Sequence, residues 1–326
     1  MSRTVIYYRT EPERDRWLPG DRFIRPAIRR LMRDRPRPGG LGKVFINLCL
    51  GLDRLGIPYQ VNPPFKDLRE DDRVGVLGRG RYALQGYDRP NPIVAGIGLM
   101  THPSEWPTLC EEYPVIRYLQ HSEWTNDIYR PYFGERCVIW PVGIDTRAWT
   151  PSVAAKDLDV LLYDKVQWNR AHSEQTLIQP VRQGLHRRKL KFAELRYGSY
   201  EEADFRALLA RSRAMIFLSE SESQGLAYQE CLSCDVPVIA WDQGWWLDPN
   251  RFQWGDPNVR ATSVPYFDSR CGDRFRNLEE FEIKFDLFFD RAHRQEFDSR
   301  AFILENLTLE LCSQRFIDIL RPGRVS

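Results

Sequence analysis

The stretch that most constrains the fold of this chain runs from residue 214 to residue 242. Short apolar runs at residues 215–218 and 236–240 flank a segment that begins at Gly225 and has helical spacing. This order of strand, loop, helix and strand predicts a βαβ unit. In such a unit the loop after the first strand lies at the carboxyl edge of a parallel sheet, where the helix presents its free N–H groups. We therefore expect an anion to bind at this loop.

Two carboxylates flank the expected anion site. Glu222 lies in the loop, Glu230 follows inside the helix, and Gly225 stands at the turn, where a close backbone approach needs a residue without Cβ. Carboxylates accept hydrogen bonds from vicinal hydroxyls. Glu230 is therefore a candidate for binding a ribose and Glu222 for binding a second sugar, with a diphosphate between them on the amides of Gly225 and Leu226. The alternative is a solvated helix with two surface Glu residues, the commoner meaning of such a pair.

The sequence E-S-Q-G-L-A-Y-Q-E-C-L-S-C-D-V-P-V-I-A resembles the Glu, seven residues, Glu motif of retaining glycosyltransferases of the GT-B fold, in the large glycosyltransferase family four. Asp235 stands where that family usually has Gly, and Asp tolerates a left-handed helix cap. The resemblance implies an α/β chain with two Rossmann-like domains that face each other across a cleft. Residues 1–151 would form the acceptor side, residues 152–300 would bind the nucleotide sugar, and residues 301–326 would form a helix that returns to the first domain.

Length and composition agree with this division. The 326 residues suit two domains of roughly 150 residues each. The 47 Lys and Arg against 45 Asp and Glu do not favour nucleic acid as a partner. Seven Cys, no secretory signal and no apolar run near the length of a membrane span lead us to expect a cytoplasmic protein. We expect Cys231 and Cys234 to be buried thiols and not metal ligands.

The N-terminal part is locally basic. The first 43 residues hold 12 Lys or Arg against 5 acidic residues, a local net charge of +7. Apolar and Arg positions in residues 22–33 repeat at helical spacing, which predicts a basic amphipathic helix. One interpretation is a helix packed on its own domain with a solvated Arg face. The other is peripheral contact with the inner membrane face, where the resemblance implies lipid-linked acceptors.

The resemblance implies that two further pairs of residues bind the diphosphate of the donor. Gly40 and Gly42 precede an expected helix and offer a nest for phosphate, and members of the family carry a similar loop that faces the diphosphate. Lys165 and Arg170 follow an expected strand at residues 160–163, where the family usually has an Arg and then a Lys. The order is reversed here, and it matters because Arg makes a forked contact with phosphate whereas Lys acts as a point charge.

A histidine and a cluster of tryptophans complete the candidates. His102 follows an apolar segment at residues 93–100 and could contact the donor sugar, or it could be a surface His before a Pro turn. Trp241, Trp245 and Trp246 could stack on a sugar or an acceptor, or cover the edge of the core. The Asp-Leu-Asp at residues 157–159 precedes its strand, unlike the metal-binding Asp-x-Asp of another glycosyltransferase fold, so we expect no metal and no cofactor.

These features predict retaining transfer of a sugar from a nucleotide diphosphate sugar to an acceptor hydroxyl on a glycan or lipid-linked acceptor, in exopolysaccharide or cell-surface glycan synthesis. Two alternatives stay open. A sugar-nucleotide epimerase of the same fold would alter the donor without an acceptor, and a non-catalytic protein would bind the nucleotide sugar only. The catalytic candidates are Lys165, Arg170, Glu222 and His102, and the donor-binding candidates are Glu230, Gly225, Leu226, Gly40 and Gly42.

Overall fold

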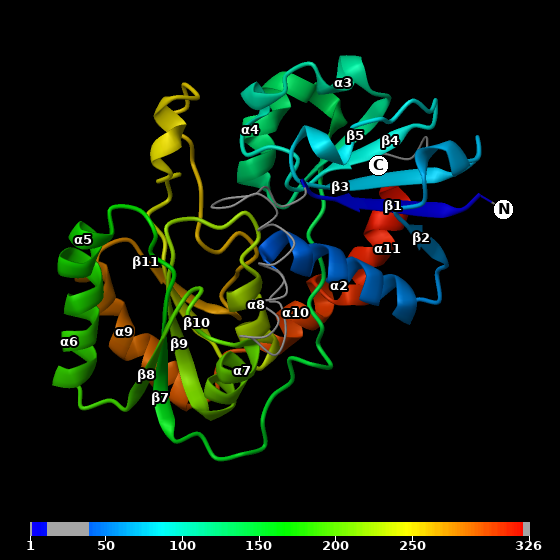
Figure 1. Cartoon of the computed structure of the whole chain (residues 1–326). Helices are drawn as coiled ribbons and strands as arrows, with labels where there is room; N and C mark the ends of the chain where they lie inside the picture. Colours follow the sequence, from blue (N-terminus) through cyan, green and yellow to red (C-terminus); the bar gives the residue numbers. More distant parts are fainter. Residues whose placement is uncertain (1, 12–38, 322–326) are drawn as a thin grey trace, which may run out of the picture.

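Short apolar strands that alternate with helices build two parallel sheets, one from each half of the chain (Figure 1). The computed structural model describes residues 2–11 and 39–321. The first sheet has six strands in the order β2-β1-β3-β4-β5-β6, and the second has five in the order β11-β10-β9-β7-β8. Parallel pairing sends every chain connection across a face of its sheet, so helices cover the faces. The basic helix expected at residues 22–33 lies outside the described residues.

The elements have the following bounds. The strands of the first sheet are β1 (Thr4–Arg9), β2 (Tyr59–Val61), β3 (Arg73–Gly78), β4 (Ile93–Gly96), β5 (Val115–Gln120) and β6 (Cys137–Ile139). Those of the second sheet are β7 (Leu158–Asp164), β8 (Phe192–Arg196), β9 (Ser212–Leu218), β10 (Val238–Trp241) and β11 (Gly272–Phe275). The helices are α2 (Gly40–Arg54), α3 (Leu109–Glu112), α4 (Glu123–Phe133), α5 (Arg170–Ser173), α6 (Gln179–Arg187), α7 (Glu202–Arg211), α8 (Leu226–Ser233), α9 (Leu278–His293), α10 (Ser299–Asn306) and α11 (Leu309–Ile319).

The predicted βαβ unit is present as β9, α8 and β10. Strands β9 and β10 pair in parallel, with Met215 opposite Val238. Asp235 ends the unit's helix with a φ of +57°, so the prediction of a left-handed cap at this Asp is confirmed. The helix after the Gly-rich segment begins earlier than expected. Gly39 caps it in an extended conformation and Gly40 is its first residue, so Gly42 lies inside the first turn and not in a preceding loop.

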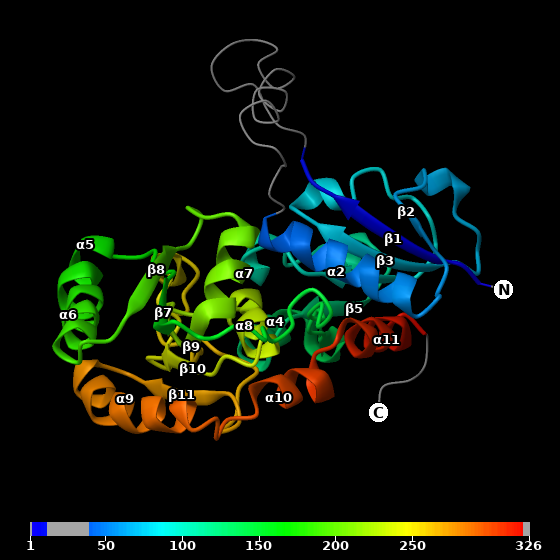
Figure 2. The same ribbon diagram turned by 90° about the horizontal axis from the view of Figure 1, so that it is seen from below.

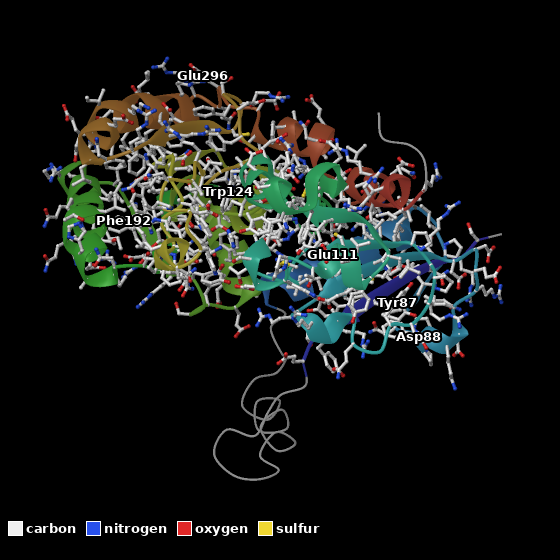
Figure 3. All side chains as sticks on the ribbon, turned by 90° about the horizontal axis from the view of Figure 1, so that it is seen from above. Tyr87, Asp88, Glu111, Trp124, Phe192 and Glu296 are labelled. Atoms are coloured by element: carbon white, nitrogen blue, oxygen red, sulfur yellow. The ribbon has the colours of Figure 1, made fainter. Side chains whose placement is uncertain are left out.

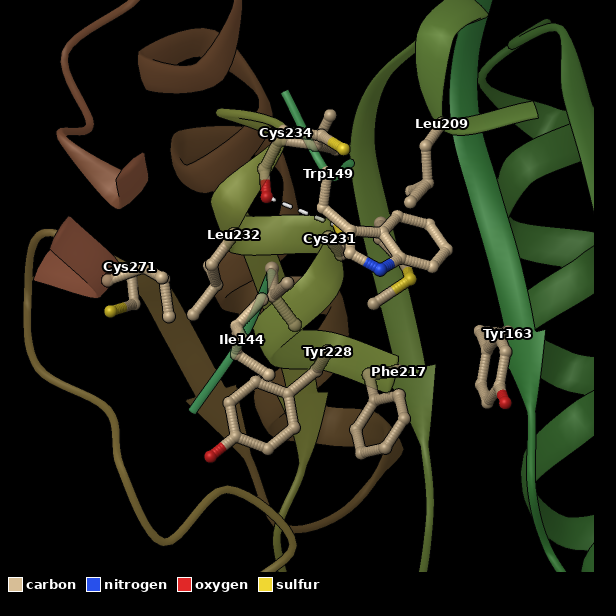
Figure 4. Close-up of a cluster of buried hydrophobic side chains, with 14 of the residues drawn as sticks. Ile144, Trp149, Tyr163, Leu209, Phe217, Tyr228, Cys231, Leu232, Cys234 and Cys271 are labelled. Carbon is tan, nitrogen blue, oxygen red and sulfur yellow. Dashed lines mark hydrogen bonds between the residues drawn. The ribbon is translucent and has the colours of Figure 1, made fainter. Parts of the chain in front are cut away.

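Both sheets are buried on both faces. In β3 the neighbouring residues Val76 and Leu77 point to opposite faces and are both fully buried. In the second domain, Tyr163, Phe217 and Tyr228 form a line of rings with centroids 5.5 and 5.6 Å apart (Figure 4). The predicted burial of Cys231 and Cys234 as thiols is confirmed, because both lie in this core and neither forms a disulfide.

The last helix, α11, lies against α2 of the first domain (Figure 2). The two helices approach closely at Gly51, where a Cβ would lie 2.0 Å from Oγ of Ser313. The indole of Trp140 donates a hydrogen bond of 2.9 Å to the carbonyl of Cys312 and adds a second attachment. The end of the described chain therefore contributes to the core of the first domain. No helix within residues 2–11 and 39–321 is both long and apolar enough to span a bilayer.

Candidate functional site

Glu222 is held in the loop between β9 and α8. Its Oε1 accepts a hydrogen bond of 2.8 Å from Oγ of Ser219, and its backbone N–H donates to the carbonyl of Thr262. Nζ of Lys165 lies 2.6 Å from Oε1 and 2.8 Å from Oε2. Only 7% of Glu222 is exposed. The structure therefore brings together two of the predicted residues, a buried carboxylate and the cation that neutralises it.

Lys165 comes directly after β7, and its position follows from the neighbouring strand. Its backbone N–H donates to the carbonyl of Leu218, the last residue of β9, at 2.7 Å. This hydrogen bond places the side chain beside the β9–α8 loop. Nζ also lies 4.7 Å from the centre of the ring of Tyr197, which is 47% exposed. An exposed aromatic ring at the end of β8 is a surface on which a flat base can stack.

Glu230 projects from α8 and is paired with a residue that we did not predict. Only 4% of it is exposed, and its Oε1 forms an ion pair with Nζ of Lys43 from the first domain. Burial raises the pKa of Glu230 to about 7, against the opposing effect of Lys43. Lys43 also lies 3.1 Å from Oε2 of Glu202. Burial lowers the pKa of Lys43, but the two carboxylates outweigh it and the net pKa is raised.

The turn between the two carboxylates requires glycine. Gly225 has a φ of +84°, and a Cβ there would lie 2.2 Å from the ring of Tyr228. Leu226 then begins α8, whose first amides have no acceptor inside the helix. Its side chain packs against the cores of both domains. Gly40 and Gly42 lie at the start of α2, the helix that carries Lys43, so the first turn of that helix lies near Glu230.

Arg170 is bound differently from Lys165. Its Nη1 donates to Oδ1 of Asp164 at 2.6 Å, and its Nη2 donates to Oε2 of Glu174 at 2.9 Å. Asp164 is fully buried, and its hydrogen bond raises the pKa of Arg170. The structure therefore separates the two predicted cations. Lys165 meets Glu222 of the loop, whereas Arg170 is held by carboxylates next to its own helix.

His102 is fully buried, so the surface interpretation is wrong. Its Nδ1 is 2.7 Å from Oγ of Ser104, and its Nε2 is 2.7 Å from Oδ2 of Asp256. Its ring stacks on Trp254 with centroids 5.1 Å apart. Asp256 and Trp254 come from the second half of the chain. His102 thus attaches the segment around Trp254 to the first domain, and both of its ring nitrogens have protein partners.

A second histidine lies at the end of a neighbouring strand and was missed. His121 follows β5, and its Nδ1 is 3.2 Å from the carbonyl of Trp140. Burial lowers its pKa to about 4, so the ring is neutral at pH 7. Three residues later, the indole of Trp124 donates to the carbonyl of Glu222 at 2.8 Å, in the middle of the molecule (Figure 3). The sequence signal was a His directly after an apolar strand, the same signal that selected His102.

Gln224 joins the two domains beside the site. Its Oε1 accepts from the N–H of Val142 at 2.8 Å, and its Nε2 donates to the carbonyl of the same residue at 2.6 Å. Nε2 also donates to Oε1 of Gln229. Gln224 is buried, and its side-chain amide satisfies the backbone N–H and carbonyl of Val142, as the backbone of a neighbouring strand would. The site loop and the segment that connects the domains are therefore held in one arrangement.

No protein-family model matches this sequence, and no curated protein matches it. Solved structures do match. WaaG, a glycosyltransferase involved in lipopolysaccharide biosynthesis, has a TM-score of 0.53 at 10% identity over 98% of this chain and all of its own. Sucrose-phosphate synthase from Thermosynechococcus elongatus has a TM-score of 0.54 at 10% identity over 97% of this chain and 98% of its own.

The pneumococcal O-GlcNAc transferase GtfA, in complex with UDP and GlcNAc, has a TM-score of 0.51 at 11% identity over 78% of this chain. This chain spans 58% of the length of GtfA. The two parallel sheets of six and five strands match the architecture of these proteins over nearly the whole of this chain in two of the three comparisons. The chain therefore has the two-domain α/β GT-B fold of these glycosyltransferases.

Proposed function

We propose that this protein is a retaining glycosyltransferase, similar to glycosyltransferase family four, that moves a sugar from a nucleoside diphosphate sugar to an acceptor hydroxyl. The observation that carries the proposal is the arrangement around Gly225. Two buried carboxylates, Glu222 and Glu230, lie on either side of a glycine turn, and each is paired with a Lys. Buried carboxylates are costly without partners. Hydroxyl and phosphate groups of a nucleotide sugar can partner the carboxylates and the ammonium groups together.

Each residue then has a role. Glu230 accepts hydrogen bonds from the ribose hydroxyls, and Glu222 accepts from hydroxyls of the transferred sugar. The first amides of α8, from Leu226 onward, hold the diphosphate. Lys165 neutralises the charge that develops on the diphosphate as it leaves, an effect that is strong in a site shielded from water. No carboxylate nucleophile is part of the proposal.

The neutral ring of His121 is suited to the donor sugar. When Nδ1–H donates to the carbonyl of Trp140, Nε2 keeps its lone pair and can accept from a sugar hydroxyl. A contact between His102 and the donor sugar stays a prediction. Both ring nitrogens of His102 have protein partners, so the sugar would have to replace one of them. Arg170 is already bound to Asp164 and Glu174, so a diphosphate would compete with these two carboxylates for its guanidinium group.

The neighbours support the choice of substrates. GtfA was solved with UDP and GlcNAc, and a mutant of TarM from S. aureus with UDP, fondaparinux and alpha-GlcNAc-glycerol. WaaG takes part in lipopolysaccharide biosynthesis. We accordingly propose a nucleoside diphosphate sugar as donor, a glycan or lipid-linked acceptor, and a place in cell-surface glycan synthesis in the cytoplasm. Peripheral contact with the inner membrane face through residues 22–33 belongs to the same proposal.

Thermal stability against a panel of nucleotides tests the donor class. UDP, GDP and their sugars are added to the wild type, to Glu230→Ala and to Glu202→Ala, a matched loss of the other carboxylate that contacts Lys43. One nucleotide should raise the Tm of the wild type with a shift that grows with concentration. Glu230→Ala should lose that shift and Glu202→Ala should keep it. If no nucleotide moves the Tm at millimolar concentration, the assignment of the site is wrong.

A second experiment separates the reaction classes. The nucleotide sugar that binds is incubated with the enzyme alone and then with candidate acceptors, and the products are followed by NMR. A retaining transferase leaves the sugar of the donor unaltered until an acceptor is present and then gives a product with the anomeric configuration of the donor. Epimerisation of the donor sugar in the absence of an acceptor would instead establish an epimerase.

A further inference from the structure

We propose that Lys43 is a phosphate ligand that acts from the first domain. In the structure Lys43 pairs with Glu230, and a bound nucleoside diphosphate replaces that pair by one between Lys43 and its phosphate oxygens. The inference rests on the proposed function, because Glu230 is taken there as the ribose ligand. It adds to the site a cation from the first domain, which the motif of Glu222 and Glu230 in the second domain does not contain.

The position of Lys43 favours an anion. It is the fourth residue of α2, within the first turns of a helix of 15 residues, where free amides and the helix dipole attract negative charge. The start of α2 lies beside α8 in Figure 1 and beside α7 in Figure 2. Lys43 contacts one residue of each of these helices, Glu202 of α7 and Glu230 of α8. Its ammonium group therefore lies against the carboxylate that is assigned to the ribose, and the phosphates of a nucleotide begin at the carbon next to that ring.

The charges favour an exchange. A ribose diol that donates to both oxygens of Glu230 competes with Lys43 for Oε1, which the ammonium group already contacts. Once displaced, the ammonium group needs another anion, because Glu202 alone is half exposed and offers a weak, hydrated contact. A diphosphate supplies that anion. Lys is suited to the movement, since its charge sits on a flexible stem with three rotatable donors.

The surroundings keep Lys43 close while it moves. Nζ lies 5.2 Å from the centre of the ring of Trp149, whose face attracts cations, and the guanidinium carbon of Arg206 lies 4.8 Å from the centre of the same ring. The two carboxylates hold the pKa of Lys43 above its ordinary value, so the side chain is a cation at neutral pH. Because α2 belongs to the first domain and α8 to the second, a diphosphate bound by Lys43 and the α8 amides would join the two domains around the donor.

The test compares ligands that differ only in phosphate. Dissociation constants of uridine, UMP and UDP, and of the guanosine series, are measured by calorimetry for the wild type, Lys43→Met and Lys43→Arg. The quantity of interest is the Kd of the nucleoside divided by the Kd of its diphosphate. In Lys43→Met this ratio should fall by about tenfold, since one charge-assisted contact to phosphate is lost. Lys43→Arg should keep it within about threefold, because the cation is retained.

Arg54→Met is the matched control. It removes a cation from the other end of α2, about 16 Å along the helix, where Arg54 pairs with Asp145. Its ratio should equal that of the wild type, which shows that loss of an ion pair of α2 is not enough. If the ratio in Lys43→Met stays within about threefold of the wild type, Lys43 is only a bridge between the domains and the inference is overturned. If the wild type binds neither series, the proposed function itself fails and the inference falls with it.

Discussion

Lys43 of the first domain and Glu230 of the second form an ion pair at the site, although the first residue lies on α2 and the second on α8. Glu230 lies in α8, the helix that follows Gly225 and the loop of Glu222, so one helix of the candidate donor site also makes this contact between the domains. We therefore expect binding at the site and the contact between the domains to be coupled.

The first prediction concerns pH. The pKa of Glu230 is about 7 in the folded protein, against an ordinary value of 4.5. Between these values the folded state binds more protons than the unfolded state, so this group's contribution makes the protein less stable as the pH rises from 4.5 to 7. The slope for one proton is at most about 1.4 kcal/mol per pH unit.

Urea unfolding of the wild type and Glu230→Gln at several pH values measures this contribution. The Gln variant should lose that part of the slope, since its amide does not titrate in this range. The same slope in both proteins would show that Glu230 has an ordinary pKa in the folded state. Glu202→Gln is the control, because it removes the exposed carboxylate near Lys43.

A second prediction concerns Gly225→Ala. The positive φ costs an Ala about 1 kcal/mol or more, and the contact with the ring of Tyr228 adds to this cost. The control is Gly86→Ala, because Gly86 has a φ of +83° and open space around its Cβ position. Chemical denaturation should show a greater loss of stability for Gly225→Ala. Equal losses in the two variants would mean that Tyr228 moves aside without cost.

A third prediction separates the two cations. Lys165→Met should lower kcat by about a hundredfold, because it removes the charge assigned to the leaving diphosphate. Arg170→Met should mainly lower stability, on the order of 3 kcal/mol, since it leaves the buried carboxylate of Asp164 without its cation. Steady-state kinetics well below the Tm and urea unfolding measure the two effects. Arg188→Met, which removes ion pairs with Asp286 and Glu282 on α9, is the control.

A loss of activity in Arg170→Met would also be informative about the roles of Lys165 and Arg170. If Arg170→Met loses kcat as strongly as Lys165→Met while both proteins remain folded, Arg170 leaves Asp164 and contacts the donor. The reversed order of Lys and Arg in this chain would then be of little consequence for the chemistry.

A fourth prediction concerns the segment attached through His102. Asp256→Ala removes the partner of a fully buried ring nitrogen and should cost about 1–3 kcal/mol. If His102 has only this role, kcat/KM of the folded variant should equal that of the wild type at low temperature. A loss of kcat/KM with an unchanged Tm would instead support contact between His102 and the donor sugar.

The sequence by itself determined the local features of the site. The βαβ unit, the left-handed cap at Asp235 and the burial of the thiols around Cys231 were all predicted, because each depends on the periodicity or the backbone preference of residues close together in the chain. The reversed order of Lys165 and Arg170 was also visible. Their different partners were not visible, since the choice between Glu222 and Asp164 depends on how the strand ends are arranged in space.

Only the tertiary structure decided which distant residues meet. The ion pair of Lys43 with Glu230, the hydrogen bond from Trp124 to Glu222 and the burial of His102 against Trp254 all join the two halves of the chain. Such contacts depend on how two domains pack, which no local pattern encodes. The sequence thus placed the carboxylates on their loop and helix, whereas the packing of the domains gave Glu230 its cation and raised its pKa, because burial and charge are properties of the folded surroundings.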